Sequence, residues 1–286
     1  MENATTAPPA EPQDHLVALW QRAEKYAATL RERRLGLAPA EFWYPYGTMW
    51  NFHTFNRLLS GKNRNLLRDI HPKRAADIGA ADGDLAFFLE QEGWQMTIID
   101  NPPTNWNGLQ GARLYRDSTG SQVEITEMDL DSQFQLTDRY DLVFFLGILY
   151  HLKNPFYALE QLSRHTRYAL ISTRIMRWSQ PAGPQAGTSP QLLERIKRWS
   201  QPAEPQAGTS PQILEHLPLA YLLGPAECNN DATNYWIFSD AGLRRILDRT
   251  GWQIEDYLID GATEVADPFS AEGDARAFCL VKSRHS

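Results

Sequence analysis

The alternation of short apolar segments with helical patterns, which begins at Arg74, constrains the fold of this chain more than any other feature. Seven candidate strands follow one another at residues 74–78, 95–99, 123–128, 140–146, 168–173, 253–259 and 276–282. Helical patterns lie between them, for example at residues 84–92, 155–165 and 240–250. This order is typical of a parallel sheet with crossover helices on both faces. The sequence therefore predicts an α/β fold with a Rossmann-like, mostly parallel sheet of seven strands, the last of them antiparallel.

The N-terminal quarter of the chain follows a different pattern. Residues 1–13 are polar and rich in Pro and Ala, which predicts a disordered tail. Apolar residues then recur at helical spacing from 14 to 35, and an aromatic segment follows at residues 42–56. We expect residues 14–72 to form a helical and aromatic cap on the main domain, which comprises residues 73–286.

One internal duplication interrupts the main domain. Residues 174–194 recur almost unchanged at 195–215. Each copy contains a Pro- and Gly-rich loop, and a Thr-Ser-Pro sequence then favours the start of a short helix. We expect the duplicated region, residues 174–215, to be an insertion after the fifth strand, either a tolerated surface segment or a lid.

The composition excludes several classes of protein. There are only two cysteines, and the seven histidines do not cluster with carboxylates, so neither a disulfide framework nor a metal site is predicted. The longest apolar run, residues 142–149, is far shorter than the ~20 residues needed to span a bilayer. The N-terminus also lacks the basic and apolar segments of a signal peptide. We expect a cytoplasmic protein with no metal and no membrane partner.

Charge is unevenly distributed along the chain. The formal net charge is −7, yet basic residues gather between Arg57 and Arg74. A basic strip on an acidic protein can bind phosphate groups, for example those of a nucleic acid. The alternative is a solvated helix face with no partner.

A glycine-containing loop after the first predicted strand indicates a ligand site. The strand ends at Asp77, Gly79 and Gly83 lie in the loop, and the next helix starts at Asp84. Gly79 allows the chain to turn sharply off the strand, and small residues allow the backbone to approach a ligand closely. In sheets of this type, ligands bind beyond the carboxyl ends of the strands. Asp100, at the end of the second strand, can accept hydrogen bonds from both hydroxyls of a ribose.

The spacing of the loop residues selects among nucleotides. In a dinucleotide-binding pattern, Ala81 would replace the middle glycine and Asp84 would lie beside the pyrophosphate, where its charge is repulsive. S-adenosylmethionine (SAM) has no phosphate and carries a sulfonium cation, which the acids Asp77, Asp82 and Asp84 would tolerate or favour. SAM is therefore the predicted cofactor, and methyl transfer the predicted reaction. A tight turn with no ligand and an NAD(P) oxidoreductase are the weaker alternatives.

The ends of the later strands provide further candidate residues. Asp129 and Leu130 follow the third strand, where an adenine amino group can be contacted by a carboxylate or by exposed backbone. Leu146 and Gly147 end the fourth strand. The pair Tyr150 and His151 comes next, and we predict these as the catalytic residues, because a base assists methyl transfer to a hydroxyl. For His151 the alternative is a helix-start residue that bonds nearby backbone.

From about residue 44 to residue 282, the chain resembles the wobble-uridine tRNA methyltransferase-like group, which includes enzymes that carboxymethylate tRNA 5-hydroxyuridine with carboxy-SAM. The residues that carry the resemblance are Tyr46-Gly47, 50–59, 77–83, Asp100-Asn101-Pro102, 147–151 and 276–278. The G-x-L-Y-H segment at 147–151 is the most specific of these. The resemblance implies cofactor contacts from Gly79, the turn Asp100 to Pro102, Asp129, Leu130 and Leu146. It also implies that Tyr150, Arg276 and Trp50 lie near the transferred group.

The identity of the acceptor stays open between a tRNA and a small metabolite or glycan, and a catalytically inactive SAM-binding regulator is a further alternative. We predict that Tyr46, Trp50, Asn234 and Trp236 roof the acceptor pocket. Aromatic side chains there would stack on an unpaired base, or they would form ordinary hydrophobic core. The carboxy-SAM enzymes of the group use a lysine shortly before the Tyr-Gly pair, and residues 35–45 contain no lysine. The predicted donor is therefore ordinary SAM rather than carboxy-SAM.

Overall fold

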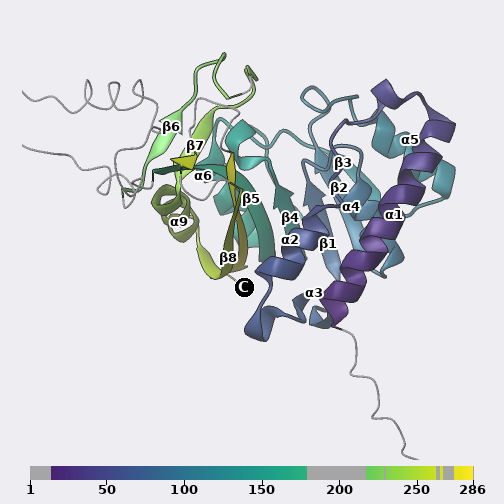
Figure 1. Cartoon of the computed structure of the whole chain (residues 1–286), viewed down its shortest axis with the longest axis horizontal. Helices are drawn as coiled ribbons and strands as arrows, with labels where there is room; N and C mark the ends of the chain where they lie inside the picture. Colours follow the sequence, from purple (N-terminus) through teal and green to yellow (C-terminus); the bar gives the residue numbers. More distant parts are fainter. Residues whose placement is uncertain (1–13, 179–216, 229, 262–264, 267–273, 286) are drawn as a thin grey trace, which may run out of the picture.

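The computed structural model of the chain describes residues 14–178, 217–228, 230–261, 265–266 and 274–285. Its central sheet has the strand order β3-β2-β1-β4-β5-β10-β8 (Figure 1). These strands are β1 Arg74–Ile78, β2 Gln95–Asp100, β3 Glu124–Glu127, β4 Tyr140–Leu146, β5 Thr166–Trp178, β8 Trp252–Gly261 and β10 Ala275–Ser283. The first five are parallel, whereas β10 runs antiparallel to both β5 and β8. The predicted α/β fold with its antiparallel last strand is confirmed.

Helices cover both faces of this sheet. The α-helices are α1 His15–Leu37, α2 Asn51–Leu58, α3 Leu66–Asp69, α4 Asp84–Gln91, α5 Gln110–Thr119, α6 Pro155–His165 and α9 Asp240–Arg249. Short 3₁₀ helices lie at η1 Ala40–Phe42, η2 Gly61–Asn63 and η3 Leu149–His151. One hydrophobic core joins α1, α2, α4 and α5 to the sheet, and a second core joins α6 and α9 to its other face. Strand alternation divides β10 between them, because Phe278 belongs to the first core and Cys279 to the second.

The helix boundaries follow from local sequence. The Asp14 carboxylate accepts a hydrogen bond of 2.9 Å from the Leu16 N–H, which caps the start of α1. The Ser239 hydroxyl accepts one of 3.0 Å from the Gly242 N–H and caps α9 in the same way. Pro155 lies in the first turn of α6, where its missing N–H costs nothing. These caps explain why the helices start where the sequence pattern predicts them.

Strand β5 extends beyond its predicted end at residue 173 and continues to Trp178. Its extension pairs in parallel with β7 (Trp236–Ser239) and antiparallel with β9 (Val265–Ala266), and β7 pairs in turn with β6 (Ala220–Leu222). Figure 1 shows β6 and β7 on the opposite side of the molecule from α1. The first residues of the duplicated region thus belong to the sheet. The rest of that region, from 179 to 215, and the predicted tail at 1–13 lie outside the described residues.

The topology brings the candidate residues to one edge of the sheet. The strand order changes direction between β1 and β4, and ligands bind in open α/β sheets at the carboxyl ends of strands at such a point. Because β10 is antiparallel, its first residues lie at this same edge, where Arg276 pairs with Arg174 of β5. Across the described ranges, no helix is long and apolar enough to cross a membrane, and no group of His, Cys, Asp or Glu could hold a metal ion.

Candidate active site

The loop from Gly79 to Gly83 adopts backbone conformations that favour glycine. Its φ angles are 68° at Gly79, 53° at Ala81 and 80° at Gly83. A Cβ added to Gly79 would lie 2.1 Å from the Ile148 Cδ1 atom, so a side chain there would require Ile148 to move. Ala81, which departs from the glycine pattern, nevertheless takes the left-handed conformation of the residue it replaces. The loop therefore has the backbone of a cofactor loop despite the substitution.

Asp100 holds this loop from the neighbouring strand. Its carboxylate accepts hydrogen bonds from the Ala81 N–H at 3.1 Å, the Asn101 N–H at 2.7 Å and the Asn105 amide at 2.9 Å. Burial raises the pKa of Asp100, and these hydrogen bonds oppose the rise. A carboxylate offers about four acceptor positions, so about one remains for a ribose hydroxyl. Accepting both hydroxyls, as the sequence predicts, would require one of the present bonds to be displaced.

Asp77 lies at the end of β1 with its side chain largely buried. The residue is 6% exposed, and it accepts no hydrogen bond from any residue within the described ranges. Burial, with the negative charges of Asp100 and Asp84, raises its pKa to about 8. A buried carboxyl without a partner is costly, and a cationic ligand would compensate for that cost. The residues at this edge therefore fit SAM, whose ammonium and sulfonium groups are both positive.

Asp82 and Asp84, two of the acids that would tolerate or favour a sulfonium, already have a cationic partner within the chain. Both form ion pairs with the buried Arg34 of α1, and the Asp82 pair measures 3.8 Å. The Trp43 ring lies 4.8 Å from the Arg34 guanidinium carbon. Asp82 also accepts hydrogen bonds from the Tyr44 N–H at 2.6 Å and from the Asn107 amide at 2.7 Å. These two acids fasten the N-terminal cap to the loop.

The structure brings together residues after β4 and at the start of β10. The Arg276 Nη1 atom lies 3.4 Å from the Tyr150 hydroxyl, to which it donates. Gly147 has a φ of 74°, and a Cβ there would lie 3.5 Å from the same hydroxyl. Arg276 also pairs with Asp274 at 3.2 Å. Tyr150, Gly147 and Arg276 thus form one cluster at the carboxyl end of β4.

His151 lies beside this cluster. Its ring centre is 4.3 Å from that of Tyr150. Its Nδ1 atom lies 3.0 Å from the Thr233 hydroxyl and 3.2 Å from the Thr233 carbonyl oxygen. Burial lowers the pKa of His151, so the ring is neutral at neutral pH. Thr233 was not predicted, because it lies in a distant segment with no motif of its own.

The aromatic segment divides between core and surface. Phe52 and Phe55 are fully buried, whereas Tyr46 is 70% exposed and Trp50 is 50% exposed. Trp50 contacts Phe278 of β10 edge-on, with a ring distance of 5.8 Å. Tyr44 is half-buried, and its burial and then the nearby Tyr150 phenol raise its pKa. Each alternative for this segment, core or exposed ring, therefore describes some of its residues.

Asn234 and Trp236 lie in the loop before β7 and at its start. The Asn234 amide donates to the Cys228 carbonyl at 3.1 Å, and Trp236 packs against the second core. Within the described part of the chain, the Asn234 Oδ1 and Trp236 Nε1 atoms are buried without a hydrogen-bond partner. The Tyr235 N–H donates to the Tyr150 carbonyl at 2.8 Å, which places this loop against η3.

The remaining predicted cofactor residues lie around the same edge. Asp129 is engaged locally, because the Ser132 hydroxyl and the Asp131 N–H both donate to its carboxylate and lower its pKa. Leu130 is buried in the second core. Asn101 and Pro102 form the turn after β2, and Leu146 is half-buried at the end of β4. A contact from Asp129 to adenine would therefore compete with its own turn.

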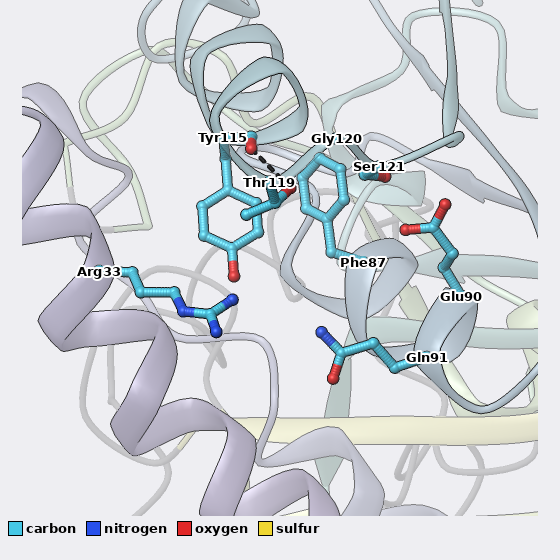
Figure 2. Close-up of a pocket in the computed structure, with 8 residues that line it drawn as sticks. All are labelled: Arg33, Phe87, Glu90, Gln91, Tyr115, Thr119, Gly120 and Ser121. Atoms are coloured by element: carbon cyan, nitrogen blue, oxygen red, sulfur yellow. Dashed lines mark hydrogen bonds between the residues drawn. The ribbon is translucent and has the colours of Figure 1, made fainter.

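A separate pocket lies between α1, α4 and α5 (Figure 2). Its lining includes Arg33, Glu90, Gln91 and Tyr115. Helices α4 and α5 run from the carboxyl edge of the sheet toward its amino edge, and Gln91 and Thr119 are their last residues. The pocket therefore opens away from the cofactor loop, and it shares no residue with the candidate site.

The sheet order, the loop after β1 and the carboxyl groups of Asp77 and Asp100 at this edge are those of a Rossmann-like, SAM-dependent methyltransferase. The comparison with protein families agrees: a family model described as a methyltransferase domain matches residues 50–257, and the chain belongs to this family. The matched region includes the cofactor loop, Tyr150 and His151. It omits most of the N-terminal cap and also Arg276.

Similar proteins of known activity cover only part of the chain. The ubiquinone biosynthesis O-methyltransferase of Yersinia enterocolitica is 27% identical over 138 residues, which are 47% of this chain and 56% of that protein. The Yersinia pestis protein of the same description is 26% identical over 146 residues, 49% of this chain and 59% of its own length. The chain thus spans little more than half the length of the curated relatives it matches.

Solved structures also resemble the chain. The N-terminal domain of EvdMO1 with SAH bound has a TM-score of 0.48 at 15% identity, covering 90% of this chain and 96% of that one. Magnesium protoporphyrin IX methyltransferase from Synechocystis, with SAH bound, has a TM-score of 0.40 at 16% identity, covering 73% and 74%.

Proposed function

We propose that this methyltransferase transfers the methyl group of SAM to a hydroxyl oxygen of a small molecule. The observation that carries the proposal is the position of His151, a neutral imidazole beside Tyr150 and near Arg276 at the carboxyl end of β4. When bound, SAM supplies a methyl group on a positively charged sulfur, which is a good leaving group. The residues of the chain must bind the cofactor, align the acceptor and take up the hydroxyl proton.

The cofactor would be held at the carboxyl ends of β1, β2 and β4. The loop from Gly79 to Gly83 offers close backbone approach, while Asp77 and Asp100 offer negative charge to a cation. Leu146 and Gly147 border the site on the β4 side. Because Asp129 is engaged in its own turn, we propose that Leu130 and the neighbouring backbone make the adenine contact.

The acceptor would lie between His151 and the exposed aromatic residues. Tyr46, Trp50 and Trp106 are 70%, 50% and 58% exposed, and rings of this kind can flank a flat acceptor and exclude water. Arg276 and Tyr150 would orient a polar group of the acceptor. A hydroxyl acceptor uses the base that His151 offers, and the curated relatives are described as O-methyltransferases.

The basic strip gives a reason to prefer a small molecule to tRNA. Most of its cations already pair with carboxylates of this chain: Arg57 with Asp260 at 2.8 Å, Lys62 with Glu255 at 2.5 Å, Arg64 with Asp14 at 2.7 Å, Arg68 with Asp69 at 2.7 Å and Arg74 with Asp138 at 3.1 Å. A phosphate backbone would have to compete with these partners. The tRNA acceptor that the resemblance implies stays a prediction without support from this strip.

A labelling experiment tests the proposal. The protein is incubated with SAM carrying a radioactive methyl group and with separate pools of phenols, sugars and total tRNA. We expect label in a hydroxyl-bearing small molecule, and a loss of about 10²-fold or more in His151→Gln. His165→Gln is the matched control, since His165 ends α6 at the opposite edge of the sheet. Label in tRNA and in no small molecule would overturn the proposed acceptor.

A further inference from the structure

Two residues of the loop before β7, Asp231 and Thr233, form a chain of hydrogen bonds that ends at His151. The Thr233 hydroxyl lies 2.6 Å from the Asp231 Oδ1 atom, and the Thr233 N–H donates to the same oxygen at 2.9 Å. The Thr233 hydroxyl also lies 3.0 Å from the Nδ1 atom of His151. The sequence motifs single out neither Asp231 nor Thr233.

The direction of each hydrogen bond follows from the chemistry of the groups. An ionised carboxylate only accepts, so the Thr233 hydroxyl must donate its proton to Asp231. Although burial opposes ionisation, the hydrogen bonds from Thr233 hold the pKa of Asp231 below its ordinary value. The Thr233 oxygen then has only lone pairs to offer His151. The Thr233 carbonyl oxygen, 3.2 Å from the same nitrogen, is an acceptor too.

Both partners of Nδ1 are therefore acceptors, so Nδ1 must carry a proton. A neutral imidazole has one N–H and one lone pair, which leaves the lone pair on Nε2. No residue in the described ranges forms a hydrogen bond with Nε2. A second contact, from the Tyr235 N–H to the Tyr150 carbonyl at 2.8 Å, fixes the loop against η3 on the other side of Thr233.

We propose that Asp231 and Thr233 are positioning residues that hold His151 in the tautomer with its proton on Nδ1 and its lone pair on Nε2, so that Nε2 is the proton acceptor. The inference rests on the proposed function for its catalytic meaning, although the tautomer itself can be tested without the reaction. The acceptor hydroxyl gives its proton to Nε2, the ring becomes an imidazolium, and Nδ1 keeps its proton on Thr233. Asp231 then stabilises the positive ring from behind.

Among the described residues, the charges that act on the ring come from different elements. Asp231 favours the charged ring from the loop, and Arg276 disfavours it from β10. Tyr150 is the neighbour of His151 in η3. The Nζ atom of Lys153, two residues after His151, lies 5.5 Å from the Tyr235 ring centre. Removing the charge of Asp231 should therefore lower the pH at which the ring is half protonated.

Nitrogen NMR of the full chain tests the tautomer directly. In ¹⁵N-histidine-labelled protein, the seven histidines give separate signals, and His151→Gln identifies the relevant one. At a pH where the ring is neutral, we expect the Nδ1–H form in the parent. We expect a larger share of the Nε2–H form in Thr233→Val, where only the more distant backbone carbonyl still accepts from Nδ1, and the parent pattern again in Thr233→Ser, which restores the hydroxyl. The Nε2–H form in the parent would overturn the inference.

Kinetics separate this inference from the proposed function. In Thr233→Val and Asp231→Asn we expect kcat to fall about ten- to a hundredfold, with acceptor KM and SAM affinity within about threefold of the parent. The rise of kcat with pH should move to lower pH in Asp231→Asn. Unchanged kcat and pH profile in both variants would overturn the positioning role. If instead His151→Gln retains full activity, the proposed function fails, while the NMR result still decides the tautomer.

Discussion

The backbone N–H of Tyr44 donates a hydrogen bond of 2.6 Å to the carboxylate of Asp82, which fastens the N-terminal cap to the loop that follows β1. Arg34 strengthens the same junction from α1 through its ion pairs with Asp82 and Asp84. These cap residues lie outside the region that the methyltransferase family model matches. The cap and the cofactor loop therefore form one structural unit, although only one of them belongs to the matched domain.

The buried ion pair between Arg34 and Asp84 should be important for stability. Arg34→Met leaves Asp84 and Asp82 buried without their cation, and breaking such a pair costs about 3–5 kcal/mol. We expect a loss of that size in the free energy of unfolding, measured by urea denaturation. Arg22→Met is the control, because the pair of Arg22 with Glu92 is solvent-exposed and should contribute less than about 1 kcal/mol. Equal losses in the two variants would contradict this assignment.

Asp100 should be required for cofactor binding. Asp100→Ala removes the acceptor for the Ala81 N–H and the Asn105 amide as well as any bond to the ribose. Lost hydrogen bonds to a charged group cost ~1.5–3 kcal/mol each, so we expect at least a tenfold weaker affinity for SAM. Calorimetry measures this, with Asp117→Ala as the control because Asp117 pairs only with its neighbour Arg116 in the described contacts. An unchanged affinity in Asp100→Ala would show that the loop is held by other contacts.

Ala81 should not prevent cofactor binding, although it replaces a glycine of the motif. Its left-handed φ of 53° costs an L-residue about 1–2 kcal/mol, and a glycine there would instead lose about 0.5–1 kcal/mol of chain entropy. Ala81→Gly should therefore raise the free energy of unfolding by up to about 1 kcal/mol and leave SAM affinity within twofold. Turnover in the parent excludes the inactive-regulator alternative. A variant that gains SAM binding absent from the parent would contradict this prediction.

The parts of the fold that sequence predicts are those that local patterns determine. Buried strands appear as apolar runs, and Gly79 and Gly147 mark turns with a positive φ, which favours glycine. Long-range polar pairing is not visible in such patterns. The sequence shows Asp82 and Asp84 as acids of the loop, but it does not show that both pair with Arg34 of α1.

The extension of β5 and the partner of His151 escaped prediction for a related reason. The sequence from residue 174 reads as the start of a duplicated insertion, yet pairing with β7 and β9 continues the strand to Trp178. Thr233 meets His151 across 82 positions of the chain. Turn residues and hydrophobic periodicity report local structure, so they do not predict such contacts between distant segments of the chain.

Asp77 should couple both stability and cofactor binding to pH. Its pKa in the folded chain is about 8, above the ordinary 3.8, so the folded chain keeps a proton that the unfolded chain loses. The contribution of Asp77 to the free energy of unfolding should therefore be largest below about pH 4, and it should be lost as the pH rises toward 8. Asp77→Asn, which resembles the protonated acid in shape, should reduce that decline.

Cofactor binding should favour the ionised form of Asp77 over the protonated form, because a cationic ligand stabilises the carboxylate and lowers its pKa. Below pH 8, SAM binding should then release a proton from Asp77. Calorimetry at pH 7 in two buffers with different ionisation enthalpies measures this release as a difference in apparent binding enthalpy. The Asp77→Asn variant should release less, and the difference between the two proteins excludes protons lost by SAM itself or by Asp100. Identical release from both proteins would mean that the carboxyl of Asp77 does not meet the positive charge of the cofactor.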